Sequence, residues 1–246
     1  MNIGLYESAS ALSALEHWQD AVAQNISSSQ VTGYKKRTVE FAATLMGEMS
    51  PNGKTRVGDG QPGSFPQAIY GISYKQGEVS PTKRPLDLAL QGQGFFVIQS
   101  PDGSKVYTRD GALSIRSDRT LIGASGGVLL SDANSPIQTL PNGNPIVINH
   151  DGTIFQGDAR LGKVKVVKFD DNSRLIPAGS GGFLAPGQDP VTVDKPEVMQ
   201  GYLEGANVSP LREMVDLVTI SRAYEANQKL IQSRDGTFEK ALEKLG

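Results

Sequence analysis

The residue types that most often perform metal and thiol chemistry are scarce in this chain of 246 residues. It contains no cysteine and only two histidines, His17 and His150, which lie far apart in the sequence. A chain without cysteine has no disulfide, thiol nucleophile, iron–sulfur cluster or Cys-containing zinc site. The two histidines cannot form a local metal-binding motif. We therefore expect no metal ion and no cofactor.

Other patterns resemble parts of catalytic sites, but their context argues against that interpretation. Residues 53–55, Gly-Lys-Thr, lack the glycine five positions earlier that a phosphate-binding loop needs, and Gly92 and Gly94 lead into a strand-like run. No Gly-x-Ser-x-Gly motif accompanies either histidine. The acidic residues that could pair for glycoside hydrolysis occur in turn-like contexts, where aspartate usually caps the backbone: Asp102, Asp110, Asp151, Asp158, Asp170 and Asp171. We therefore expect no catalytic residue and no enzyme.

The charge balance excludes further classes of partner. The chain has 24 basic and 26 acidic residues, too even a balance to attract a polyanion, and we interpret residues 35–37, Lys-Lys-Arg, as a solvated junction. No apolar run approaches the length of a membrane span, and no basic residue precedes Lys35 as a secretory signal would require. We expect no nucleic-acid binding, no membrane insertion and no cleaved signal peptide.

Glycine and proline divide the chain into three parts. Most of the 28 glycines and 14 prolines lie between residues 47 and 206, so both ends favour helices and the middle favours turn-rich β structure. Apolar residues from Leu5 to Ile26 recur every three or four positions, which is typical of one face of a helix. A second helix is predicted to begin at Ser209, a good N-cap, with Pro210 in the first turn, and to continue nearly to Leu245.

A seven-residue repeat marks the second helix. The positions that recur are Leu217, Tyr224, Ile231, Phe238 and Leu245. This spacing keeps one edge of a helix facing a neighbour, but the companion positions Asn227 and Arg234 are polar, which indicates several neighbouring helices rather than one. A hairpin formed by the two terminal helices of a single monomer is the alternative.

The middle of the chain predicts short antiparallel strands. Residues 94–98, 146–148 and 163–169 are rich in β-branched and aromatic residues, and turn dipeptides such as Asp110-Gly111 separate such runs. Residues 47–70 predict an extended linker or long loop. The expected domains are a helical domain of residues 1–34 and 207–246, a linker and extended region of residues 35–75, and a central β domain of residues 76–206. The predicted fold class is α+β, with long N- and C-terminal helices forming a coiled-coil-like helical domain beside a mainly antiparallel β domain.

Several motifs resemble those of the flagellar basal-body rod and hook protein family. The most specific is the C-terminal stretch of residues 200–210, followed by residues 213–217 and 222–229; residues 85–96 and 107–111 are similar to the strand-and-turn motifs of the family's β domain. Residues 26–31 depart from the family's usual N-terminal run. The short chain and the opening Gly4-Leu5-Tyr6 are most similar to the proximal-rod type. The positions that match family motifs are Asn25, Gly33, Tyr34, Gly201, Tyr202, Glu204, Asn207, Arg222, Tyr224, Glu225 and Asn227.

The resemblance implies a structural subunit that polymerises through its terminal helices into the hollow axial drive shaft of the flagellum. It implies partners among copies of this chain and other rod subunits, export by the flagellar type III apparatus, a place in the rod that crosses the periplasm, and terminal helices that are poorly ordered before assembly. The expected intersubunit residues are Leu5, Leu12, Leu15, Val22, Ile26, Leu217, Tyr224, Ile231, Phe238 and Leu245. The alternatives are a distal-rod or other axial subunit of the hook and basal body, or a secreted β-rich binding or hydrolytic domain.

Overall fold

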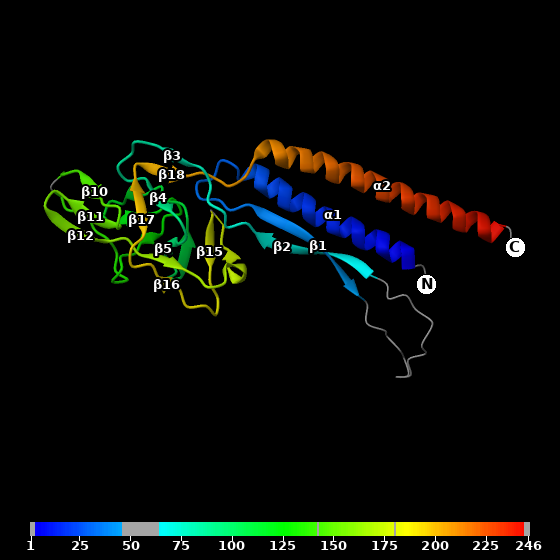
Figure 1. The fold of residues 1–246 in the computed structure, drawn as a ribbon, viewed down its shortest axis with the longest axis horizontal. Helices are drawn as coiled ribbons and strands as arrows, with labels where there is room; N and C mark the ends of the chain where they lie inside the picture. Colours follow the sequence, from blue (N-terminus) through cyan, green and yellow to red (C-terminus); the bar gives the residue numbers. More distant parts are fainter. Residues whose placement is uncertain (1–2, 46–63, 142, 180, 244–246) are drawn as a thin grey trace, which may run out of the picture. The chain divides into compact units, whose positions relative to one another are not determined.

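The computed structural model describes residues 3–45, 64–141, 143–179 and 181–243. The chain divides into two compact units (Figure 1). The first, here called the helical unit, contains residues 1–27, 37–71 and 209–246, and the second, here called the β unit, contains residues 28–36 and 72–208. The phosphate-loop-like residues 53–55 and most of the predicted linker 47–70 lie outside the described residues.

In the residues that the structure describes, two helices and one pair of strands form the helical unit. Helix α1 (Ile3–Ser27) lies beside helix α2 (Pro210–Glu243), and strand β1 (Arg37–Leu45) pairs with strand β2 (Ser64–Ile72). Aromatic side chains attach the strands to α1: the rings of Trp18 and Phe41 lie 5.6 Å apart, edge to face, and those of His17 and Tyr70 lie 5.4 Å apart. The apolar face of α1 is therefore divided between a helix and a sheet.

The predicted fold class is wrong in its helical part. The terminal helices were expected to form a coiled-coil-like domain by themselves, but the described chain contains only two α-helices, of 25 and 34 residues, and β1 and β2 belong to the same unit. The physical reason is visible at Trp18, which lies on the apolar stripe that the sequence assigned to helix packing and instead contacts Phe41 of β1. The combination of helices with a mainly β middle agrees with the prediction.

The β unit is built from short strands. The largest sheet has the order β14-β15-β6-β5-β9-β8-β7, with β13 pairing with both β5 and β16; β10, β11 and β12 form a second sheet, and the pairs β17–β4 and β18–β3 complete the unit. The strands are β3 (Val79–Pro81), β4 (Leu88–Gln91), β5 (Phe95–Gln99), β6 (Lys105–Thr108), β7 (Ser114–Ile115), β8 (Leu121–Ile122), β9 (Val128–Leu129), β10 (Ile146–Ile148), β11 (Thr153–Gln156), β12 (Ala159–Lys163), β13 (Val166–Lys168), β14 (Ile176–Pro177), β15 (Gly182–Leu184), β16 (Val191–Thr192), β17 (Glu197–Gln200) and β18 (Tyr202–Glu204).

Strand β5 separates two apolar clusters. Successive side chains of a strand point to opposite faces. Accordingly, Phe96 and Ile98 are buried with the larger cluster, whereas Phe95 and Val97 are buried with the smaller one. A strand that is buried on both faces explains why residues 94–98 form a continuous apolar run rather than an alternating one.

The strand predicted over residues 163–169 is divided in two. Strand β12 ends at Lys163 and β13 begins at Val166. Between them the Val164 N–H donates to the Gly152 carbonyl, 2.8 Å away, one position beyond the pairing of Thr153 with Lys163. Val166 and Val167 are buried in different clusters, so β13 is covered on both faces at these two residues.

Tyr74 gives the β unit an alkaline sensitivity that can be tested. Its ring packs against Phe183, 5.5 Å away, and its hydroxyl has no hydrogen-bond partner in the described part of the chain. Burial, with a smaller effect from Asp171, raises the pKa of Tyr74 from 10.0 to about 12. The unfolded chain therefore ionises at a lower pH than the folded one, and the stability that the neutral phenol contributes is lost as pH rises from about 10 to about 12.

We expect Tyr74→Phe to leave stability at pH 7 nearly unchanged, because the hydroxyl that is removed has no partner. The variant should lose less stability than the unsubstituted chain when urea unfolding is repeated above pH 10. Equal alkaline losses in the two proteins would contradict this assignment. Tyr107, whose pKa is also raised by burial, is unchanged in both proteins, so the difference between them isolates Tyr74.

Candidate functional site

The predicted interface residues that the structure describes lie on α1 and α2, which pack side by side in the helical unit (Figure 1). Val22 is buried, with 2% of its surface exposed. The half-buried members are Leu12, Leu15, Ile26, Leu217, Tyr224 and Ile231. Leu5 and Phe238 belong to the helices, but their side chains are outside the description, as is Leu245. The packing of α1 on α2 thus covers this seam only in part.

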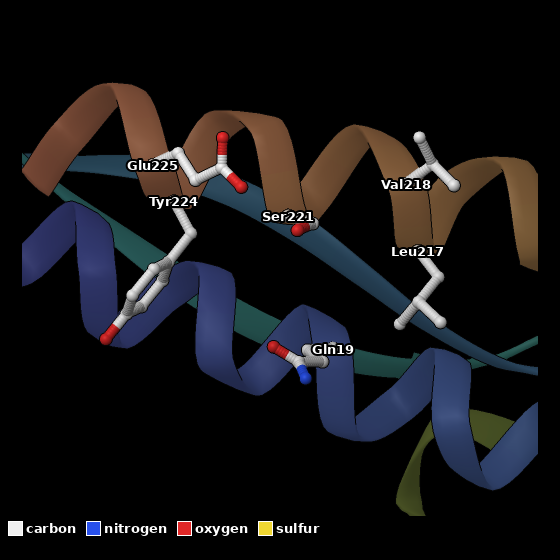
Figure 2. A pocket seen from close by; sticks show the side chains of 6 residues that line it. All are labelled: Gln19, Leu217, Val218, Ser221, Tyr224 and Glu225. Atoms are coloured by element: carbon white, nitrogen blue, oxygen red, sulfur yellow. The ribbon is translucent and has the colours of Figure 1, made fainter.

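A shallow hollow lies along the line where α1 and α2 meet. It has a volume of about 560 Å³ and is lined by Gln19 of α1 and by residues of α2. Figure 2 shows Leu217 and Tyr224 pointing from α2 toward α1, whereas Val218 points away from α1. Leu217 and Val218, which are adjacent in the sequence, therefore lie on different sides of α2.

A buried amide and a buried carboxylate join the two helices near one end. The Asn25 side chain donates to Glu213 at 2.9 Å, donates to the Arg37 carbonyl at 2.9 Å and accepts the Arg37 N–H at 2.8 Å. Both Asn25 and Glu213 are 0% exposed. This contact fixes the end of α1, the start of β1 and the first turn of α2 to one another. Glu213 lies in the first turn of α2, and its carboxylate accepts this hydrogen bond from an asparagine on the other helix.

The β unit contains a second polar cluster, centred on Glu204. Its Oε1 lies 2.6 Å from Lys35 Nζ and accepts the Gly77 N–H at 3.0 Å, and its Oε2 lies 3.1 Å from Arg109 Nη1. Glu204 is 0% exposed, Lys35 3% and Arg109 5%. Two buried cations therefore share one buried carboxylate. The interpretation of Lys35 as part of a solvated basic junction is wrong, because the β unit encloses its ammonium group.

Backbone carbonyls complete the coordination of these cations. Lys35 Nζ also donates to the Lys75 carbonyl at 2.8 Å, and the Arg109 guanidinium donates to the carbonyls of Leu90 and Gly92. Burial lowers the pKa of the Lys35 ammonium, although the hydrogen bond that it donates to Glu204 opposes that shift. Each charge of the cluster is therefore paired and hydrogen-bonded, as buried charges require.

The side-chain amide of Asn207 connects its own segment with the segments around residues 36 and 74. Its Oδ1 accepts the Lys36 N–H at 2.6 Å, and its Nδ2 donates to the carbonyls of Ser73 and Lys75 at 2.7 and 2.9 Å. Segments around residues 35, 75 and 205 are thus held together inside the β unit by Glu204 and Asn207. Along the chain, these segments adjoin β1, β2 and α2.

Gly33, one of the family-motif positions, makes a close approach in the β unit. Its φ is +68°, and a Cβ there would lie 2.4 Å from the Asp110 nitrogen and 2.5 Å from the Arg109 carbonyl carbon. We expect Gly33→Ala to destabilise the β unit by more than the ~1–2 kcal/mol that a left-handed backbone alone costs. Gly103→Ala is the matched control, since Gly103 has a φ of +84° and nothing within 4 Å. Equal urea midpoints for the two variants would contradict this account.

The remaining motif positions have mainly structural surroundings. Tyr34 is buried. Gly201 has a φ of +79° at the turn between β17 and β18, and Tyr202 is the first residue of β18. On α2, Arg222 and Glu225 are exposed and Asn227 is half-buried.

The residues considered for catalysis are not brought together. His17 contacts Tyr70, and among the described residues no group of three or more histidine, cysteine or acidic side chains could hold a metal ion. Four of the aspartates cap their own turns by accepting a backbone N–H two residues later: Asp102, Asp110, Asp151 and Asp171. The interpretation of these four as turn residues is confirmed.

Comparisons with known proteins agree with the sequence motifs. Residues 199–244 match the family model described as flagellar basal body rod FlgEFG protein C-terminal, and residues 89–156 match that of the flagellar hook protein FlgE/F/G D1 domain. A flagellar basal-body rod protein FlgF of Mesorhizobium japonicum is 31% identical over 100% of this chain and 99% of its own length. The chain belongs to the flagellar basal-body rod protein family. A FlgG rod protein of Borreliella burgdorferi is 32% identical over 94% of each chain, and a FlgF of Caulobacter vibrioides is 30% identical over 100% of this chain.

The comparisons confirm the expected rod protein of the proximal-rod type, a structural subunit of the flagellar basal body. Rod proteins assemble with other axial subunits of the flagellum. Among the described residues of this rod protein, neither helix is long and apolar enough to cross a membrane. The C-terminal match contains Glu204 and Asn207, and the other match contains Arg109.

Proposed function

We propose that this rod protein polymerises through α1 and α2, and that the half-buried seam between these helices is completed by neighbouring subunits. The observation that carries the proposal is that Leu217 and Tyr224 point from α2 toward α1 and yet remain half-exposed in a single chain. Ile231, seven residues after Tyr224, is half-exposed as well. Covering apolar surface that one chain leaves in water drives association. A contact between different surfaces that does not close into a ring produces a helical filament, as a rod requires.

The same proposal defines partners and location. Copies of this chain and other rod subunits are the assembly partners, and the flagellar type III apparatus exports the chain without a cleaved signal peptide to the part of the rod that crosses the periplasm. The role is architectural rather than catalytic. The scarcity of histidine and cysteine and the capping role of the described aspartates support this view.

The test replaces Tyr224 and Ile231 together by aspartate in the bacterium that produces the protein. We expect rods to fail and swimming to stop, because two carboxylates would be buried in the seam between subunits. The control variant Val147→Asp changes an apolar residue of the β unit that is already 49% exposed, and it should assemble normally. Normal rods and normal swimming in the double variant would overturn the proposal.

A further inference from the structure

Helix α2 carries a second apolar face, opposite the one that packs on α1. Leu211, Met214, Val215 and Val218 are 75%, 51%, 59% and 52% exposed. At 3.6 residues per turn, Leu211 and Val218 lie about 160–180° around the helix from Ile220, which is 1% exposed against the rest of the helical unit. A helix with apolar residues on opposite sides is typical of one that is covered on both sides. The seam between α1 and α2 covers only one of these two sides.

The outer face of α2 continues into a stretch of charged residues with a positive balance. Arg222 and Lys229 lie in line with Leu211 and Val218 along the helix and are exposed, and Glu225 lies between them. In the described part of the chain, no carboxylate lies within ion-pair distance of either cation. This face therefore offers an apolar patch followed by a stretch with one net positive charge.

The outer face of α1 has the complementary character. Helix α1 contains no lysine or arginine, and Glu16 and Asp20 are exposed one turn apart. Their neighbours on the same face, Ala9, Ser13 and Ala23, are small and exposed. Small side chains allow another helix to approach closely, and the acidic pair carries the charge opposite to that of the cations on α2.

We propose that the outer face of α2, defined by Leu211, Met214, Val215, Val218, Arg222 and Lys229, binds the outer face of α1 of a second copy of this chain. The apolar patch supplies most of the affinity, and the pairing of Glu16 and Asp20 with Arg222 and Lys229 sets the register, because exposed ion pairs contribute little energy but discriminate between alignments. The two faces differ, so each bound copy leaves one of each free and the contact can repeat without closing.

This inference rests on the proposed function and is tested by exchanging the charges. One variant carries Glu16→Lys and Asp20→Lys, a second carries Arg222→Glu and Lys229→Glu, and a third carries all four changes. We expect each double reversal to lower the amount of this subunit in isolated basal bodies by about tenfold and the fourfold variant to recover most of the loss, since the opposite charges meet again. Arg160→Glu with Lys168→Glu is the control, because both residues are exposed on the β unit.

The outcomes separate this inference from the broader proposal. If both double reversals assemble like the unsubstituted chain, or if the fourfold variant assembles no better than the double reversals, the pairing of these faces is wrong. If, in addition, Tyr224→Asp with Ile231→Asp assembles normally, the role of the terminal helices is wrong as well. Circular dichroism of each purified variant establishes that the helical content is unchanged, so that a loss of assembly reports the surface and not the fold.

Discussion

Replacing Glu204 by glutamine is expected to lower the free energy of unfolding of the β unit by about 3–5 kcal/mol. Glutamine keeps the size of the side chain and one acceptor oxygen but removes the negative charge. Lys35 and Arg109, only 3% and 5% exposed, would then remain in the interior without a counterion. The energy is large because removing one partner of a buried ion pair leaves the other charge desolvated and uncompensated.

Urea unfolding, monitored by circular dichroism, measures this change in the free energy of unfolding. Glu197→Gln provides the control, since Glu197 is an exposed carboxylate on a strand of the same unit, and its replacement should change stability by less than about 0.5 kcal/mol. Adding Lys35→Met to Glu204→Gln should recover part of the loss, because one uncompensated cation is removed. A loss no larger than that of the control would show that the cluster does not stabilise the β unit.

Replacing Ile220 by aspartate is expected to separate α1 from α2. Ile220 is 1% exposed in the helical unit, and an aspartate there must either carry a charge into the interior or force the helices apart. The free energy of unfolding of the helical unit should fall by about 4 kcal/mol, which is typical of substitutions that bury an unpaired charge. Circular dichroism should show a loss of helical signal, while the strands of the β unit, which contains its own two apolar clusters, remain folded.

Val218→Asp is the informative comparison on the same helix. Val218 is 52% exposed and points away from α1, so aspartate there should leave the helical signal unchanged (Figure 2). In the bacterium, however, both variants should fail to form rods, the first because its helices do not pair and the second because its outer face cannot bind a neighbour. Helical signals that fall equally in the two variants would contradict the division of α2 into an inner and an outer face.

The sequence predicted the terminal helices well because their signals are local. Pro210 begins α2 as expected, and the three- and four-residue spacing of apolar positions agrees with the extent of α1. The strand pair β1–β2 was not predicted, because a stretch rich in glycine and proline follows β1 and its composition favours an extended linker. Composition does not indicate that Phe41 of β1 packs against Trp18 of the preceding helix α1.

The buried polar clusters could not be predicted from the sequence, for a different reason. Lys35, Arg109 and Glu204 come from three distant parts of the chain, and a buried lysine looks the same in a sequence as a solvated one. The resemblance to the rod and hook family did include Glu204 and Asn207 among its motif positions, yet it gave them no partner. Burial and distance identify them as the residues that join three segments of the β unit.

The absence of cysteine from the chain allows a direct test of helix-to-helix assembly. One copy carries Asp20→Cys on α1, a second copy carries Arg222→Cys on α2, and both are produced in the same bacterium. A disulfide forms only where the two Cα atoms approach within about 7 Å, so its formation in isolated, oxidised basal bodies reports contact between the two faces. A copy with Lys168→Cys in place of Arg222→Cys is the control. We predict a covalent dimer containing one copy of each helix variant and none with the control; basal bodies that contain both helix variants only as monomers would contradict assembly through these surfaces.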